Sequence, residues 1–166
     1  MTANHLHLVA VHVPVVLMPL AFVLLAIGWW KGRPSSSEAS SASAATLLAT
    51  GRSLIVVSAV VGGVAYYTGP IAFESLETEL EAARDLVELH AVIGRAAFFG
   101  LILLVVPTVQ AVVREIQEEP RSRALDATVI GGAALISYLM LWTGHYGGAI
   151  RRPEIAGVLG WIFPSF

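Results

Sequence analysis

Cysteine is absent from this chain of 166 residues, and charged residues make up only 13% of it. Without cysteine there is no disulfide, no thiolate metal site and no c-type haem attached through Cys-x-x-Cys-His. The low charge, together with 56% hydrophobic residues, excludes an ordinary soluble domain. The sequence also lacks a P-loop, a His-Glu-x-x-His motif and a recognisable Ser-His-Asp set, so it gives little support to independent hydrolytic chemistry. We therefore expect a membrane protein, and any redox centre in it must be held by ligands other than sulfur.

Four apolar runs dominate the chain, and each reaches the roughly 20 residues that a helix needs to cross a hydrocarbon core about 30 Å thick. They cover residues 6–30, 46–69, 86–113 and 124–146. The first run is long for a signal peptide and has no Lys or Arg before it, so we expect it to be retained. The prediction is an all-α fold, an integral membrane four-helix bundle built from two helical hairpins in a single domain over residues 1–166.

The segments between these runs have distinct compositions. Residues 34–45 are rich in Ser and Ala and predict a flexible loop. Residues 70–88 predict an outer loop with a short surface helix, because Leu side chains alternate with an acidic face. The aromatic residues of the tail, residues 155–166, indicate an interfacial segment or a docking strip for a partner.

Basic residues are distributed unevenly between the two ends of the predicted bundle. One end carries six of them, Lys31, Arg33, Arg52, Arg114, Arg121 and Arg123, and the other carries three, Arg84, Arg151 and Arg152. Because cytoplasmic loops are enriched in Lys and Arg, we expect both termini on the periplasmic side of a bacterial inner membrane.

All five histidines fall near helix ends on that outer side: His5, His7, His12, His90 and His145. Imidazole is the usual protein ligand for haem iron, copper and zinc, and a polar ring within a membrane needs a reason to be there. A single histidine at this depth is also satisfied by interfacial water, which is the simpler interpretation of His5 or His7 alone.

A weak internal repeat singles out two of the histidines. Each predicted hairpin ends in an aromatic-Thr-Gly motif, at Thr68 and at Thr143. His12 lies 56 residues before Thr68, and His90 lies 53 residues before Thr143. Two hairpins of one orientation imply a pseudo-two-fold axis along the membrane normal, which would set His12 and His90 opposite each other in the core. Two facing imidazoles form the axial ligand pair of a b-type haem.

The surroundings of His90 fit this hypothesis. Gly94 lies one helical turn further along, and Gly147 and Gly148 would let a flat macrocycle approach the backbone. Arg95 has no nearby carboxylate in its own helix, and a haem propionate would neutralise it. The glycines are equally compatible with ordinary helix packing, and Arg95 with snorkelling to the membrane surface.

Four motifs are similar to those of an uncharacterised family of small bacterial four-helix membrane proteins: HLHLVAVHVP, YYTGPIAFE, LHAVIGRAA and TGHYGGAIRRPEI. The resemblance covers nearly the whole chain. It matches the family pattern at nine positions, His5, His7, His12, His90, Gly147, Gly148, Arg151, Pro153 and Glu154. Two positions depart from the pattern: relatives usually carry Asn or another polar residue in place of His145, and often His in place of Arg152. The departure at His145 favours His12 with His90 as the ligand pair. A wider similarity to four-helix membrane proteins with a V-H-F-P motif implies haem binding.

These observations predict a b-type haem-binding, cytochrome b-like electron-transfer subunit with one haem, or two if His5 and His7 hold a second. Its expected partners are membrane lipid and other subunits of a respiratory or photosynthetic complex, with a quinol or a periplasmic cytochrome as redox partner and no nucleic acid. Three alternatives stay open. The first is bacteriochlorophyll in place of haem. The second is an outer-facing copper or zinc site of His5, His7 and His12 with His90 or His145. The third is a structural subunit without a cofactor.

Overall fold

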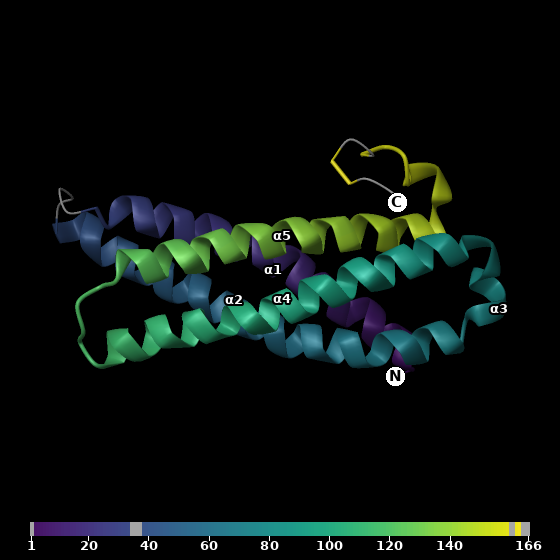
Figure 1. Ribbon diagram of the computed structural model, residues 1–166, viewed down its shortest axis with the longest axis horizontal. Helices are drawn as coiled ribbons and strands as arrows, with labels where there is room; N and C mark the ends of the chain where they lie inside the picture. The colour runs from purple at the N-terminus through teal and green to yellow at the C-terminus, as the bar shows by residue number, and fades with distance from the viewer. Residues whose placement is uncertain (1, 34–37, 160–161, 164–166) are drawn as a thin grey trace.

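The computed structural model describes residues 2–33, 38–159 and 162–163, and throughout that part of the chain the regular structure is helical. Four long helices dominate: α1 (Ala3–Lys31), α2 (Glu38–Glu74), α4 (Arg84–Ile116) and α5 (Arg123–Arg151). The short helix α3 (Glu77–Leu80) and a 3-10 turn, η1 (Glu81–Ala83), connect α2 to α4, and a second 3-10 turn, η2 (Pro153–Ile155), follows α5 (Figure 1). All four long helices are long and apolar enough to cross a membrane. The chain is thus an all-α, multi-pass membrane protein.

The helices are longer than the sequence predicted, and the predicted loops are correspondingly shorter. Residues 38–45 belong to α2 and not to a flexible loop, because Ala and Glu favour helix and Ser tolerates it there. At the other end α2 continues through Pro70 to Glu74, and most of the predicted outer loop is helical as well. Residues 34–37 of the predicted flexible loop lie outside the described part of the chain.

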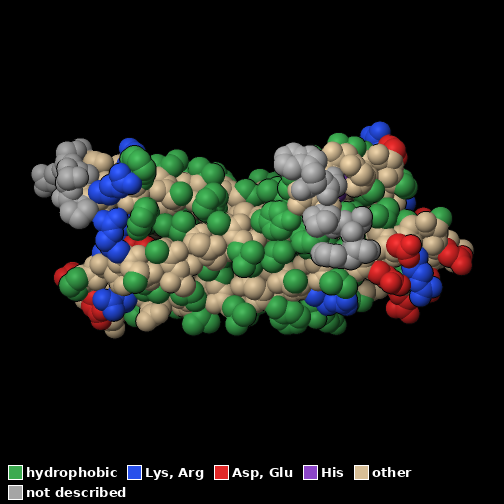
Figure 2. All heavy atoms as spheres, turned by 45° about the horizontal axis from the view of Figure 1, so that its top comes forward, with side chains coloured by type: hydrophobic (Ala, Val, Ile, Leu, Met, Phe, Trp, Pro, Cys, Tyr) green, Lys and Arg blue, Asp and Glu red, His purple; other side chains and the backbone are tan. Residues whose placement is uncertain are grey.

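The four long helices form a bundle in which α1 packs against α2 and α5, while α4 packs against α5 and α2. Helices α1 and α4 therefore occupy diagonal corners, and so do α2 and α5. The start of α4, helix α3 and the end of α5 lie together at one end of the bundle (Figure 1). Charged side chains gather at the two ends of the molecule, with a broad hydrophobic band between them (Figure 2). This is the distribution that a lipid bilayer requires.

The buried residues reveal the register of the internal repeat. Every buried residue of α1 has a buried counterpart 83 positions later in α4. The α1 set is Ala10, Pro14, Met18, Ala21, Leu25 and Gly28, and the α4 set is Ile93, Ala97, Leu101, Leu104, Thr108 and Ala111. In α2 and α5 eight buried positions correspond at a separation of 78: residues 48, 51, 55, 58, 59, 62, 65 and 68 match residues 126, 129, 133, 136, 137, 140, 143 and 146. The two hairpins are therefore related by a pseudo-two-fold axis.

This register differs from the one that the Thr-Gly motifs predicted. It aligns Thr68 with Tyr146 and Ala65 with Thr143, so the two threonines are not equivalent. It also pairs His90 with residue 7, five positions away from His12. Burial fixes the register, because each helix must turn its small and apolar stripe toward the centre of the bundle.

Candidate functional site

His7 continues the buried stripe of α1 and lies against α2. Its Nδ1–H donates a hydrogen bond of 2.9 Å to the carbonyl of Ala65. The Cε1 atom of the ring would lie 3.1 Å from a Cβ at Gly69, one helical turn beyond Ala65. Any side chain at that position would therefore crowd the imidazole, and glycine leaves the space for it.

His90 repeats this arrangement in the second hairpin. It continues the buried stripe of α4, and its Nδ1–H donates a hydrogen bond of 2.9 Å to the carbonyl of Thr143 on α5. The Cε1 atom of His90 would lie 3.1 Å from a Cβ at Gly147, again one turn beyond the carbonyl. We call each arrangement of imidazole, carbonyl and glycine a histidine latch: His7 with Ala65 and Gly69, and His90 with Thr143 and Gly147.

The hydrogen bonds of the latches fix the chemistry of the rings. A carbonyl oxygen only accepts, so Nδ1 carries the proton in both neutral imidazoles, and Nε2 carries the lone pair. Neither Nε2 atom has a hydrogen-bond partner within residues 2–33, 38–159 and 162–163. The structure thus presents two half-buried imidazoles at equivalent positions of the two hairpins, each with a free Nε2 donor.

The prediction that His12 faces His90 across the core is wrong. His12 is exposed on the outside of α1, and its Nδ1–H donates to the carbonyl of Leu8 in its own helix. It lies five residues after His7, which rotates it about 140° away from the buried stripe. The structure places His7, and not His12, opposite His90 in the repeat.

The remaining two histidines have local roles. His5 is exposed near the start of α1, where its Nδ1 lies 2.8 Å from the hydroxyl of Thr2, the N-cap of the helix. The Nε2–H of His145 donates a hydrogen bond of 3.2 Å to the carbonyl of Ala156 in the C-terminal tail. Its ring also packs against Phe163, with ring centroids 5.4 Å apart. His145 therefore holds the tail and does not face the other histidines.

The C-terminal tail folds back over the end of α5. The hydroxyls of Tyr138 and Tyr146 donate to the carbonyls of Ile162 and Phe163 at 2.7 and 2.9 Å. Gly148 lies beneath this tail, since a Cβ there would sit 3.5 Å from Ile155. The described part of the tail thus covers its own helix, whereas residues 160–161 and 164–166 lie outside the described part of the chain.

Gly94 faces the inside of the bundle, whereas Arg95 faces the outside. A Cβ at Gly94 would lie 3.4 Å from the methyl group of Thr143, so Gly94 lets α4 approach α5 beside the His90 latch. Arg95 is exposed and lies about 140° around the helix from His90. It therefore points away from the space between the histidines, and the predicted pairing with a propionate of a haem held there does not fit this geometry.

A buried ion cluster that was not predicted from the sequence lies at the opposite end of the bundle. Arg52 on α2 is only 6% exposed and binds Asp126 of α5 at 2.7 Å and Glu115 of α4 at 2.6 Å. Arg121 binds the other oxygen of Asp126, which is 3% exposed. Arg52 therefore connects the two hairpins through buried ion pairs. It is not a loop residue, so it does not count toward membrane orientation. A charge inside an apolar run on each of two helices was the signal that could have revealed this pair.

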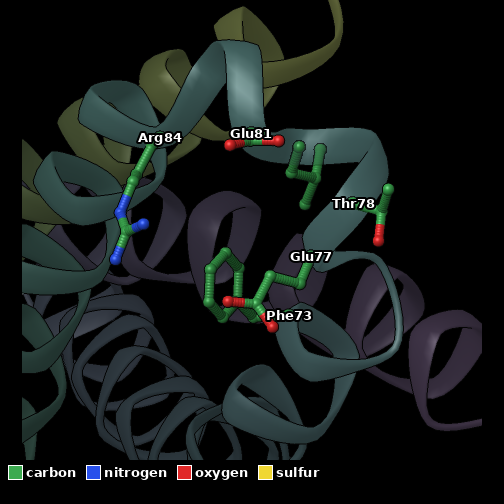
Figure 3. Close-up of a pocket in the computed structure, with 6 residues that line it drawn as sticks. Phe73, Glu77, Thr78, Glu81 and Arg84 are labelled. Atoms are coloured by element: carbon green, nitrogen blue, oxygen red, sulfur yellow. The ribbon is translucent and has the colours of Figure 1, made fainter.

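Two cavities lie at the ends of the bundle. One, of about 350 Å³, borders the ion cluster and is lined by Arg52, Glu115, Asp126 and their neighbours. The other, of about 230 Å³, lies between the end of α2 and the start of α4 (Figure 3). Glu77, Glu81 and Arg84 surround its opening, with the ring of Phe73 beside them. It is an acidic, solvent-accessible recess on the histidine end of the molecule.

The described residues contain no group of three or more His, Asp or Glu side chains that could hold a metal ion. His5, His7 and His12 are directed to Thr2, to α2 and to the outside of α1, respectively. The alternative of a copper or zinc site built from these three histidines therefore finds no support in the geometry.

Comparisons with protein-family models, with curated proteins and with solved structures find no match to this chain.

Proposed function

We propose that this chain is a membrane electron-transfer subunit that binds one b-type haem through His7 and His90. The observation that carries the proposal is the pair of histidine latches at equivalent positions of the two hairpins. A haem with two axial imidazoles needs two Nε2 donors from opposite sides, and it suits a two-fold arrangement of helices.

The residues present fit such a group. A histidine ligand of iron characteristically donates its other ring N–H to a backbone carbonyl, which fixes its tautomer and orientation, and both latches provide this bond. Ala10, three residues after His7 on α1, and Gly94, four residues after His90 on α4, are small neighbours of the two rings along their own helices. His12, Arg95 and His145 have no part in this site.

A bound haem would supply one-electron redox chemistry, which the protein's own side chains do not offer. The chain would fix the axial ligands, exclude lipid and control access from one end of the bundle. Both histidines lie in the same end of a membrane about 30 Å thick, so one haem there would not carry electrons across it. We therefore infer exchange with a quinol or with a periplasmic cytochrome, as a subunit of a respiratory or photosynthetic complex.

The placement of this end on the periplasmic side of a bacterial inner membrane rests on the charges of the helix ends. With Arg52 removed from the count, the opposite end still carries five basic residues, Lys31, Arg33, Arg114, Arg121 and Arg123, against Arg84, Arg151 and Arg152. The excess is smaller than the sequence suggested, but it retains the same sign.

The test is an absorption spectrum of the purified full-length protein, oxidised and then reduced. We expect a Soret band and a sharp reduced alpha band, both lost in His7→Ala and in His90→Ala. His12→Ala is the matched control and should keep both bands, because its ring is exposed and bonded within its own helix. His7→Met should retain the haem with a shifted spectrum and a raised reduction potential, since Met with His is an alternative axial pair.

Two results would reject the proposal. The absence of both bands in protein purified from haem-replete cells would favour a cofactor-free structural subunit, in which the latches only tie helices together. Loss of the bands in His12→Ala but not in His7→Ala would restore the pairing that the sequence repeat suggested. A bacteriochlorophyll would be recognised by its far-red absorption in the same spectrum.

A further inference from the structure

Arg95 is an exposed cation within an apolar stretch of α4, and no residue that the structure describes pairs with it. A charge facing lipid is costly unless it is neutralised or reaches the polar surface. A second copy of the chain offers no partner inside the apolar stretch, because the sequence of α4 has no acidic residue between Glu88 and Glu115, and the other helices have none at this depth. A counter-charge bound by Arg95 at this depth therefore comes from another molecule.

An aromatic platform lies directly below Arg95. Phe98 and Phe99 follow it by three and four residues, so they lie on the same side of α4 one turn deeper in the membrane. Tyr66 of α2 stacks on Phe98 with ring centroids 4.7 Å apart and meets Phe99 edge-on at 5.7 Å. We call these four residues the α2–α4 seam: Tyr66, Arg95, Phe98 and Phe99.

The depth of Arg95 in the membrane decides between two negatively charged partners, a lipid phosphate and a carboxylate on a neighbouring helix. The apolar stretch between Glu88 and Arg114 is about 37 Å long, while the hydrocarbon core is about 30 Å thick. A centred helix therefore places Arg95 only about 6 Å below the core boundary. Side chains lean toward the start of their helix, which for α4 is the near surface, so the guanidinium reaches the phosphate layer. A carboxylate on a partner helix is not needed at this depth.

We propose that the α2–α4 seam binds one anionic phospholipid from the leaflet at the histidine end of the bundle. Arg95 holds the phosphate, and one acyl chain lies along Phe98 and Phe99. The exposed ring of Tyr66 borders the same strip, and its hydroxyl has no partner among the described residues, so it is a second donor available to the bound lipid.

The equivalent position of the other hairpin provides an internal contrast. In the repeat Arg95 corresponds to His12, Phe98 to Val15 and Tyr66 to Gly144. There the polar side chain bonds to Leu8 of its own helix, and Val15 closes directly on Gly144, 3.1 Å from where a Cβ would be. That seam offers neither a free charge nor an aromatic wall, so we expect one lipid site per chain and not two.

The experiment is native mass spectrometry of the full-length protein with phosphatidylglycerol or phosphatidylcholine of identical acyl chains. The wild-type protein should retain one phosphatidylglycerol in preference to phosphatidylcholine. Arg95→Gln should reduce this preference about fivefold, as expected for one basic residue at an anionic surface, while Arg95→Lys should keep most of it. Tyr66→Leu should weaken retention of both lipids with the charge intact.

The matched control is Arg84→Gln, which removes the same charge from an exposed arginine of α4 that pairs with Glu88 at 3.2 Å. It should leave the preference unchanged. An equal loss in Arg84→Gln and Arg95→Gln, or no preference in the wild-type protein, would overturn the proposal and leave only general attraction of lipids around the protein. Release of a co-purifying polypeptide by Arg95→Gln, without a change in bound lipid, would overturn it in favour of a partner helix. None of these outcomes depends on haem.

Discussion

Replacing Asp126 by Asn should destabilise the bundle strongly, because it removes one charge of a buried ion pair. Asp126 is 3% exposed and accepts hydrogen bonds from Arg52, which is 6% exposed, and from Arg121. The substitution preserves the shape of the side chain but leaves Arg52 buried with only Glu115 as its counter-ion. Breaking a buried ion pair by removing one charge costs about 3–5 kcal/mol. Because Glu115 still binds Arg52, we expect a loss near 3 kcal/mol.

Glu115→Gln is the matched control for this prediction. Glu115 binds the same guanidinium at 2.6 Å, but its side chain is 49% exposed, so water screens the pair. Exposed ion pairs contribute about 0–1 kcal/mol, and the control should lose no more than that. The measurement is the free energy of unfolding in mixed micelles of increasing SDS content, followed by far-UV circular dichroism.

A double variant separates the charge effect from packing. Arg52→Met with Asp126→Leu replaces the buried pair by apolar side chains of similar size, and such replacements are often neutral. We expect it to recover most of the stability that Asp126→Asn loses. Equal losses in Asp126→Asn and Glu115→Gln, or losses below about 1 kcal/mol in both, would show that Arg52 and Asp126 are solvated in the folded protein and would refute the reasoning.

Two further changes test the latch and the tail. Gly147→Ala places a Cβ 3.1 Å from Cε1 of His90, so it should lower the melting temperature. The control Gly131→Ala, where nothing lies within 4 Å of the new Cβ, should raise stability by up to about 1 kcal/mol through helix propensity. A higher melting temperature in both variants would mean that His90 does not pack against Gly147. Tyr146→Phe removes the buried hydrogen bond to the carbonyl of Phe163 and should lower the free energy of unfolding by about 1 kcal/mol, measured by thermal unfolding. The control Tyr67→Phe, at an exposed ring, should have no measurable effect. Identical melting curves for the two variants would argue against the docked tail.

The hydrophobic pattern was sufficient to predict four spans and two hairpins, because membrane-spanning helices must satisfy their backbone internally and show long apolar runs. It could not predict the helix ends. The segment at residues 38–45 looks like a linker by its Ser content, yet Ala and Glu favour helix there once α2 continues beyond the apolar run.

The packing around His90 was partly predicted from the sequence. His90, Gly94 and Gly147 lie together as the sequence suggested, but the partner histidine was misassigned because the repeat was aligned on short Thr-Gly motifs. An error of five residues along a helix rotates a side chain by about 140°, enough to turn a core position into a lipid-facing one. Aligning the buried stripes of α1 and α4 places residue 7 opposite residue 90 without ambiguity. Arg52 and Asp126 carry a sequence signal, because each is a charge inside an apolar run, but 74 residues separate them and only the packing of the helices shows that they meet.

Each histidine latch closes within its own hairpin, and this has a consequence for biosynthesis. The first hairpin can enter the bilayer with His7 already seated on α2, before the ribosome has made α4. The second can do the same with His90 on α5, so each insertion step delivers a self-satisfied unit with no unpaired imidazole N–H in lipid. Only when the two hairpins meet are both free Nε2 atoms present in one bundle. A site that uses both histidines therefore forms only after the two hairpins have assembled. A cofactor held by both would bind the complete bundle and not a single hairpin.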